Sequence, residues 1–490
     1  MIEGLPALLV GLPLLVAALV FVRLLPGGPA ALGTALLLVA GALGLAVELV
    51  RAGEWLLRTP GGWPAPLGIR WQVDGLAAAM LAMMAGVGLA GVVYARTYLP
   101  SRLPHAERHF HALWLVAWSA MNSLFMAGDL FNIYVGLEFM ALAAVALIAL
   151  SREAEALQAA MRYFLATLLG SMLYLLGVAL LYGQYGVLDQ AALAEGFEVD
   201  APGRVAAVAI TLGLLMKMAL FPLHFWLPAA HGKAPAPVSA LLSGVVVAVS
   251  FYLVLRLWSG VFAPLLTSAT ATLLGILGVA SMVWGGLQAL RQQRLKMIVA
   301  YSTIAQFGLV MLVFPLFWAD GGRELAWPGG TVMVLAHGLA KAALFFAAGC
   351  LLHLHGHDRI GELPGPCGRE GWVWFAFALG SASLIGIPPT GGFLGKWQLL
   401  QAAMAGEAWS WAALVVGGSL LTAAYLYRPL EIAWRSPPRG EAAACGHLPG
   451  GLVGVAVACA VAATLLGFLV APLTALLEAT AAPLPPVAGG

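Results

Sequence analysis

Charged residues are scarce in this sequence: they make up 9% of its 490 residues, whereas hydrophobic residues make up 62%. A soluble domain carries about 25% charged residues, so this composition excludes a soluble globular protein and indicates an integral membrane protein. The formal net charge of +2 is too small to favour nucleic-acid binding. We therefore expect the lipid bilayer as a partner of the chain and no nucleic acid.

Cysteine and cofactor motifs are scarce as well. The cysteines form no CxxC pair and no metal-ligand spacing, which indicates inert thiols. They are Cys350, Cys367, Cys445 and Cys459. No Walker loop, CxxCH haem motif or iron–sulfur cysteine spacing occurs, and the histidines in 105–111 and 353–357 fit solvated helix ends. We therefore predict no bound metal, no cofactor and no redox centre in this chain.

Long apolar runs fill most of the sequence. A membrane-spanning helix needs about 20 mostly apolar residues, and this rule predicts an all-α polytopic membrane protein with about fourteen transmembrane helices. We place the spans near 4–25, 30–51, 73–96, 110–127, 130–150, 161–183, 204–221, 237–258, 265–289, 296–317, 330–352, 372–403, 409–428 and 451–476. The first span lacks a preceding basic region and a clear cleavage site, so we interpret it as retained.

Loop charges predict the orientation and the division of the chain. If both termini lie outside, the loops placed inside hold most of the loop lysines and arginines, among them Arg291, Arg294 and Lys296. The positive-inside rule therefore favours both termini outside a bacterial-type inner membrane. No segment is typical of a separate soluble domain. We divide the chain into N-terminal transmembrane helices (1–109), a central core (110–430) and a C-terminal helix with a tail (431–490).

Two apolar segments are interrupted by proline and glycine, at 222–237 and 386–396. Proline removes a helical hydrogen bond, and non-helical backbone survives at membrane depth only inside protein or beside a wet cavity. Two such interruptions are typical of a transport site in a repeated fold. They could instead be surface loops, but Lys217 and Lys396 lie close to them. We predict two broken helices.

Glu138 is the only charged residue in the apolar stretch 132–150. A charge at the centre of a spanning helix costs about 3 kcal/mol and is a functional candidate by default. An isolated carboxyl in hydrocarbon would be neutral, whereas Lys217 on another span would keep it ionised. Such a pair either changes its proton occupancy during transport or is a static ion pair that fixes helix packing.

Lys341 and Lys396 also lie within apolar spans. Lys341 follows His337 by one helical turn, so both side chains project from one face. Because histidine titrates near neutral pH, this pair predicts a proton relay. The alternative is a satisfied core histidine beside a snorkelling lysine. Lys396 could likewise extend to the membrane interface.

Two histidines, His224 and His231, lie inside the first interruption. They either carry protons between Lys217 and the aqueous phase or form ordinary hydrogen bonds within a loop. The sequence favours neither interpretation.

Five motifs in fixed order resemble one family of membrane proteins. They occupy 129–140, 217–241, 295–308, 337–349 and 386–397. They resemble the proton-translocating membrane subunits shared by respiratory complex I, membrane-bound hydrogenases and Mrp-type cation/proton antiporters. The similarity runs from about residue 70 to 430. The first and last motifs look most like the D-type membrane protein of Mrp sodium/proton antiporters.

This resemblance implies fourteen core helices with an inverted repeat of two five-helix units, each containing a broken helix. It implies that Glu138 and Lys217 form a charge pair, that Lys341 is the central lysine of a proton axis and that Lys396 is the exit-side lysine. His337 would belong to the same axis. The implied partners are other membrane subunits, protons and a monovalent cation.

The chain departs from the family pattern between Lys217 and Lys341. Many members carry a further lysine where this chain has Ala248, and some carry a histidine where it has Ser243. Neither residue titrates, so we predict a gap in the axis between Lys217 and Lys341. Three functions remain open: a proton-conducting subunit of a sodium/proton antiporter, a membrane subunit of an NADH:quinone oxidoreductase or hydrogenase, and a non-pumping scaffold.

Overall fold

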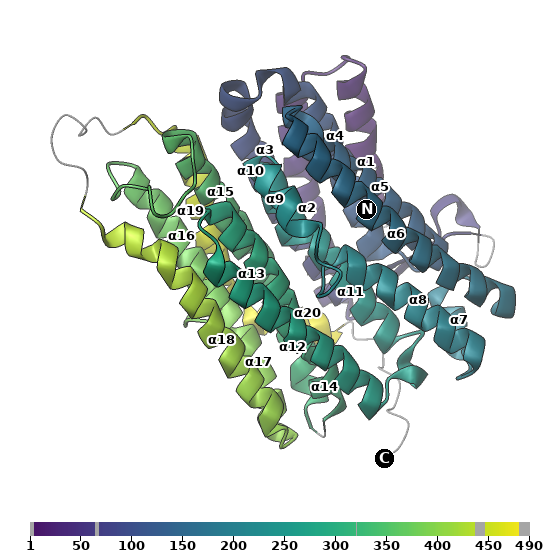
Figure 1. Ribbon diagram of the computed structural model, residues 1–490. Helices are drawn as coiled ribbons and strands as arrows, with labels where there is room; N and C mark the ends of the chain where they lie inside the picture. Colours follow the sequence, from purple (N-terminus) through teal and green to yellow (C-terminus); the bar gives the residue numbers. More distant parts are fainter. Residues whose placement is uncertain (1–3, 64–67, 320, 437–445, 480–490) are drawn as a thin grey trace.

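A computed structural model describes residues 4–63, 68–319, 321–436 and 446–479. Long helices run side by side through a single bundle (Figure 1). Ten helical segments among the described residues are long and apolar enough to cross a membrane, and Leu5–Phe21 and Glu370–Ile385 are shorter apolar helices. Helices satisfy their own backbone hydrogen bonds, as a lipid environment requires. The predicted all-α polytopic fold is thus confirmed, while the count of fourteen stays a prediction.

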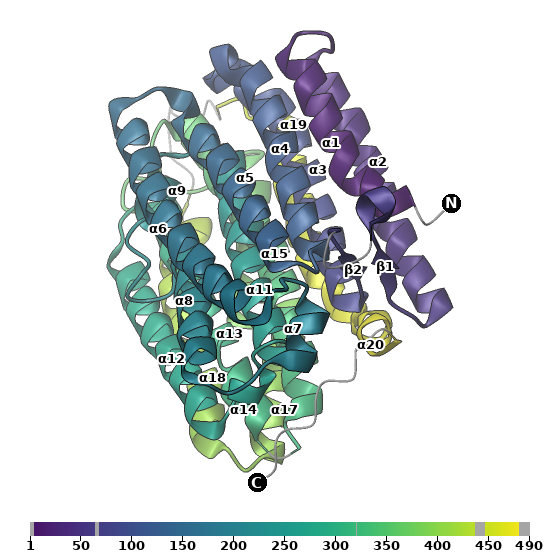
Figure 2. The same cartoon turned by 90° about the vertical axis from the view of Figure 1, so that its right-hand side faces the viewer.

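The N-terminal helices form one edge of the bundle (Figure 2). They are α1 (Leu5–Phe21), α2 (Gly27–Ala52), α3 (Gly75–Arg102) and α4 (Glu107–Met126). Between α2 and α3 the chain forms a short antiparallel hairpin of β1 (Leu56–Arg58) and β2 (Trp71–Val73). The sequence interpretation contains no strand, because three-residue strands are too short to show an alternating pattern.

The next group of helices is α5 (Leu130–Ile148), α6 (Ala154–Tyr185), α7 (Gln190–Gly196) and α8 (Ala201–Lys217). Asp129 caps α5, because its Oδ1 accepts hydrogen bonds from the amides of Phe131 and Asn132. Helix α6 packs against both α5 and α8. This packing places the middle of α5 beside the end of α8.

Both predicted broken helices are present. Helix α8 ends at Lys217, residues 218–226 form turns, and the helical path resumes in α9 (Leu227–Lys233). The second break separates α16 (Glu370–Ile385) from α17 (Gly391–Ala405). Thr390 caps α17 by accepting a hydrogen bond from the Phe393 amide, so the helix restarts immediately after the Pro388-Pro389 pair.

The centre of the bundle is built around one long buried helix, α15 (Arg323–His355), which packs on α3, α10, α13, α16, α17 and α19. The remaining helices are α10 (Ala236–Leu241), α11 (Val247–Ser259), α12 (Ser268–Arg291), α13 (Leu295–Val310), α14 (Val313–Trp318), α18 (Trp409–Leu430), α19 (Gly450–Leu465) and α20 (Val470–Ala479). A π-helical turn at Leu242–Val246 joins α10 to α11. Lys341 on α15 and Lys396 on α17 therefore lie in this central group of helices.

Three expectations need correction. The predicted span 451–476 is two helices, because the chain turns between α19 and α20. Cys367 is disulfide-bonded, so it is no free thiol, whereas Cys350 and Cys459 are free and buried; Cys445 lies outside the described residues. Lys296, which we placed in an inside loop, lies in α13 with 2% of its surface exposed.

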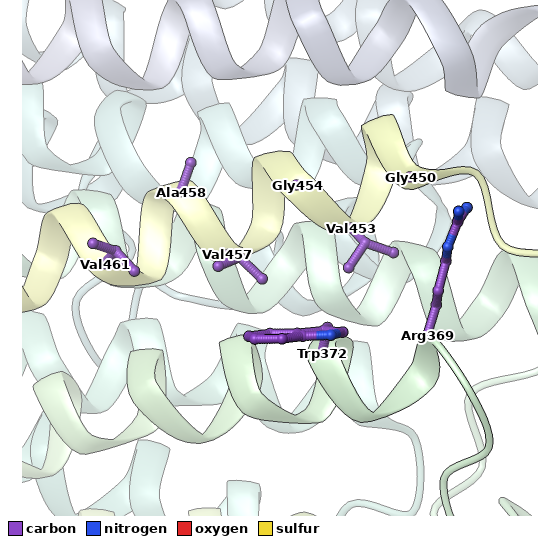
Figure 3. A pocket seen from close by; sticks show the side chains of 8 residues that line it. All are labelled: Arg369, Trp372, Gly450, Val453, Gly454, Val457, Ala458 and Val461. Atoms are coloured by element: carbon purple, nitrogen blue, oxygen red, sulfur yellow. The ribbon is translucent and has the colours of Figure 1, made fainter.

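A shallow groove of about 550 Å³ runs along the surface between α16 and α19 (Figure 3). Trp372, Val453, Val457 and Val461 line it, and Arg369 lies at one end. The lining is apolar apart from that arginine, as a surface facing lipid requires. None of the predicted site residues lies in this groove.

Candidate functional site

Glu138 and Lys217 meet inside the bundle. Glu138 Oε1 on α5 lies 3.8 Å from Nζ of Lys217, the last residue of α8. Lys217 is 2% exposed and the Glu138 side chain 21%. Neither the lysine nitrogen nor Glu138 Oε1 has a hydrogen-bond partner among the described residues. The structure thus brings the two predicted partners together in an ion pair without a hydrogen bond.

Glycines allow the helix packing that places this pair. A Cβ atom built on Gly213 of α8 would lie 2.4 Å from the Gly170 carbonyl oxygen of α6, which is too close for any side chain. The reciprocal Cβ on Gly170 would lie 2.9 Å from the Gly213 carbonyl oxygen and 3.5 Å from Lys217 Cγ. The absence of both side chains lets α6 and α8 touch at the depth of Lys217.

Lys341 lies fully buried in the middle of α15. Its Nζ donates a hydrogen bond of 2.6 Å to the Val299 carbonyl oxygen and a second one to Ser302 Oγ, both on α13. His337, one turn earlier, is 3% exposed, and the Phe307 ring lies edge-on against it at 4.9 Å. Neither ring nitrogen of His337 has a hydrogen-bond partner among the described residues. Lys341 therefore points into the protein and does not extend to the membrane interface.

Lys396 on α17 binds the end of α16 across the second break. Its Nζ donates hydrogen bonds of 2.6 Å to the Leu384 carbonyl oxygen and 3.1 Å to that of Ile385, at the C-terminal end of α16. The residue is 6% exposed. A cation at a helix C-terminus is favoured by the helix dipole. Lys396 thus points back into the protein instead of extending to the membrane interface.

The structure separates the two histidines of the first break. His231 is fully buried, stacks on the Phe345 ring at 5.0 Å, and has no hydrogen-bond partner at either nitrogen among the described residues. His224 lies at the outer surface, where its Nε2 accepts a hydrogen bond of 2.9 Å from Trp284 Nε1. Only His231 therefore belongs to the interior of the bundle.

Ala248, the position of the predicted gap, lies at the start of α11. Ala248 is fully buried and offers no polar group. One turn and a half earlier, in the π-helical turn, Ser243 Oγ pairs with Thr303 Oγ1 of α13 at 2.7 Å. A hydroxyl pair, and no titratable side chain, thus lies at the position where some family members carry histidine.

Sequence reasoning missed one buried lysine. Lys296 Nζ donates a hydrogen bond of 2.6 Å to the Ala234 carbonyl oxygen at the end of α9. We counted the residue among the charges of an inside loop, although it is also the first residue of the predicted span 296–317. The signal that could have found it is the apolar run that follows directly, from Met297 on. Among the residues that the structure describes, no group of three metal-ligating side chains is present.

Comparison with known proteins identifies the family. The model of the NADH:quinone oxidoreductase/Mrp antiporter transmembrane family matches residues 127–422, more than half of the chain. The chain belongs to this family. It is therefore a membrane subunit of the complex I/Mrp antiporter superfamily, as the five motifs predicted.

Relatives within the family carry the names of different membrane complexes. The N-type membrane protein of NADH-quinone oxidoreductase from Desulforudis audaxviator is 38% identical over 443 residues, covering 89% of this chain and 87% of the relative. The D-type membrane protein of the Na⁺/H⁺ antiporter from Alkalihalophilus pseudofirmus is 31% identical over 383 residues, covering 77% of this chain and 76% of the relative. The sequence relatives thus include components of both oxidoreductases and antiporters.

Solved structures of the superfamily share the fold. A chain of the Mrp complex from Dietzia superimposes with a TM-score of 0.87 at 25% identity, covering 98% of this chain and 97% of that one. A chain of the membrane-bound sulfane sulfur reductase, an archaeal respiratory complex, gives a TM-score of 0.86 at 26% identity, with 97% and 96% covered. The family region 127–422 contains all of the predicted site residues.

Proposed function

We propose that this chain is the proton-conducting membrane subunit of a multisubunit sodium/proton antiporter. Protons pass along an axis of buried groups, from Glu138 and Lys217 through His337 and Lys341 to Lys396. The observation that carries the proposal is the 3.8 Å approach of Glu138 to Lys217 at the end of a broken helix. The other membrane subunits of such a complex, protons and a monovalent cation are its partners.

The geometry of the charge pair favours a switch over a static ion pair. Burying two charges costs several kcal/mol per ion, and close geometry with additional hydrogen bonds is needed to offset it. This pair lacks such bonds on Lys217 Nζ and on Glu138 Oε1 among the described residues. A pair held by electrostatic attraction alone responds to a change of charge nearby, because no directional contact fixes it.

Lys341 and Lys396 donate hydrogen bonds to carbonyl oxygens, and this contact remains possible after either lysine loses a proton. Carbonyl oxygens accept a hydrogen bond from Lys341 and from Lys396, and a neutral amine donates to a carbonyl oxygen just as an ammonium does. The described residues show no carboxylate within ion-pair distance of either lysine. Each nitrogen can therefore gain and lose a proton without moving.

A second function is a membrane subunit of a complex I-like oxidoreductase. The relative that covers 89% of the chain at 38% identity carries the name of an NADH-quinone oxidoreductase component. Proton conduction would use the same residues in that setting, because redox chemistry would lie in partner subunits. The fold supports both functions to the same degree, because a chain of the Mrp complex agrees over 98% of this chain and a chain of an archaeal respiratory complex over 97%.

Flux measurements test the proposed axis. In vesicles from cells that express the whole operon, Glu138→Gln and Lys341→Ala should each lower sodium-dependent proton flux at least about tenfold, the scale of a single proton-transfer group. A dye that reports the internal pH of the vesicles measures the flux. Wild-type flux in both variants would sink the assignment.

A further inference from the structure

The lysine that the sequence analysis missed, Lys296, is buried near the first residue of α13. It is the second residue of α13, and its backbone amide donates a hydrogen bond of 3.0 Å to Asp358 Oδ2. Asp358 Oδ1 accepts a hydrogen bond of 2.8 Å from Arg294 Nε. The Arg294 side chain is 40% exposed, whereas that of Asp358 is 1% exposed. A carboxylate thus stands between solvent and the buried start of α13.

The backbone keeps this carboxylate in place. The amide of Leu295 donates to the Asp358 carbonyl oxygen at 2.8 Å, and the amide of Ile360 donates to the Gln293 carbonyl oxygen at 2.9 Å. The turn that follows α15 is therefore fastened to the start of α13 by two main-chain hydrogen bonds. The position of Asp358 beside the Lys296 amide is therefore set by backbone hydrogen bonds.

Lys296 is connected to Lys341 by one turn of α13. Lys341 donates to the carbonyl oxygen of Val299, which follows Lys296 by three residues. Residues three apart on a helix are neighbours on its surface. Lys341 therefore contacts α13 about one turn beyond Lys296.

The buried His231 lies beside the segments that contact Lys296 and Lys341. The carbonyl oxygen that accepts from Lys296 belongs to Ala234, three residues after His231. The ring on which His231 stacks is Phe345, four residues after Lys341 on α15. These two contacts place His231 near both Lys296 and Lys341.

We propose that Lys296 is a proton-loading site that connects the aqueous face at Asp358 and Arg294 to Lys341 through His231. This inference rests on the proposed function, since it supplies an entrance to the same axis. The entrance meets the axis at Lys341, beyond the gap at Ala248, so conduction through Lys341 does not require a titratable group there.

The proton balance of this route is simple. A neutral Lys296 amine takes one proton from water at the aqueous face. The ammonium gives it to one ring nitrogen of neutral His231, and the imidazolium releases a proton from its other nitrogen to the neutral amine of Lys341. One proton has then moved from water to Lys341, and Lys296 and His231 are neutral again.

Three variants test the loading site in vesicles that contain the complete complex. Lys296→Met removes the carrier, and Lys296→Arg keeps the charge and the hydrogen-bond donors but cannot release its proton. We expect both to lower proton flux at least about tenfold. Arg291→Gln, which removes an exposed charge five residues earlier at the end of α12, should leave the flux unchanged. Assembly of the complex after gentle extraction shows which variants fold.

Each result decides a separate point. Wild-type flux in Lys296→Arg overturns the loading site, because a purely structural or electrostatic role tolerates arginine. If Lys296→Met fails to assemble, the assembled arginine variant still gives the answer. If the unmodified complex shows no sodium-dependent proton flux, the proposed function itself is wrong and the loading site falls with it.

Discussion

At the scale of single residues, the four buried lysines differ in what holds them. Lys217 faces a carboxylate at 3.8 Å, whereas Lys296, Lys341 and Lys396 donate hydrogen bonds to main-chain carbonyl oxygens. A carboxylate partner carries a charge of its own, and a carbonyl oxygen does not. The Glu138–Lys217 pair is therefore the point of the axis where removal of one residue leaves an uncompensated charge.

This difference predicts the stability of variants at the pair. Lys217→Met should lower the free energy of unfolding by about 2 kcal/mol, less than for a fully buried pair because Glu138 is 21% exposed. The double variant Glu138→Gln/Lys217→Met should recover part of the loss, because no charge is then left without a partner. Thermal unfolding in detergent measures both. Equal or additive losses in the double variant would contradict an interaction between the two residues.

The sequence allowed some residues of the site to be predicted and not others. Glu138, Lys217, Lys341 and Lys396 stand out because each is a single charge within a long apolar run. Lys296 does not, because it follows two arginines and sits at the edge of such a run. A charged side chain at a helix end turns into the protein only if an acceptor lies there. For Lys296 the acceptor is the Ala234 carbonyl oxygen, which is far away in the sequence. A local sequence pattern cannot reveal such a partner.

At the scale of elements, proline and glycine made both breaks predictable, since their backbone chemistry is local. The packing that uses the breaks was not predictable. The contact between α6 and α8 depends on Gly170 and Gly213, two of 59 glycines in the chain, and nothing in the sequence distinguishes them. The last predicted span failed for a similar reason: the apolar run continues through the turn that separates α19 from α20.

The close contact between α6 and α8 predicts a position-specific effect of adding one methyl group. Gly213→Ala forces the helices apart, because its Cβ would lie 2.4 Å from the Gly170 carbonyl oxygen, and should lower the free energy of unfolding by about 1–3 kcal/mol. Gly183→Ala, on α6 where a Cβ meets nothing within 4 Å, is the matched control. It should be neutral or stabilising. Thermal shifts of the purified variants compare them, and equal shifts would argue against the contact.

At the scale of the whole molecule, ion pairs lie at both ends of the bundle. Arg256, in the last turn of α11, pairs with Asp74 at the start of α3. Arg294, which we placed inside, pairs with Asp358 at the start of α13. The positive-inside rule counts lysines and arginines near the membrane and gives acidic residues little weight. The two ion pairs therefore do not change the count of lysines and arginines on which the predicted orientation rests. The orientation with both termini outside stays a prediction.

The orientation is testable by labelling from one side of the membrane. A cysteine introduced as Arg291→Cys should react with an impermeant maleimide only in inside-out vesicles, and Arg51→Cys only in intact cells. The free thiols Cys350 and Cys459 are buried and give a low background. The opposite labelling pattern would invert the topology and would place the Lys296 entrance on the outer face.

The composition of the complete complex distinguishes the two proposed functions. This chain can supply the same proton axis to an antiporter or to an oxidoreductase, so the difference must lie in the subunits that bind it. Gentle detergent extraction followed by mass spectrometry should recover small hydrophobic subunits without flavin or iron–sulfur proteins if the complex is an antiporter. Recovery of a hydrogenase or quinone-reductase module would assign the chain to a redox machine. In that case Glu138→Gln and Lys341→Ala should still lower proton pumping through this chain at least about tenfold, now driven by electron transfer, because the same residues form the axis.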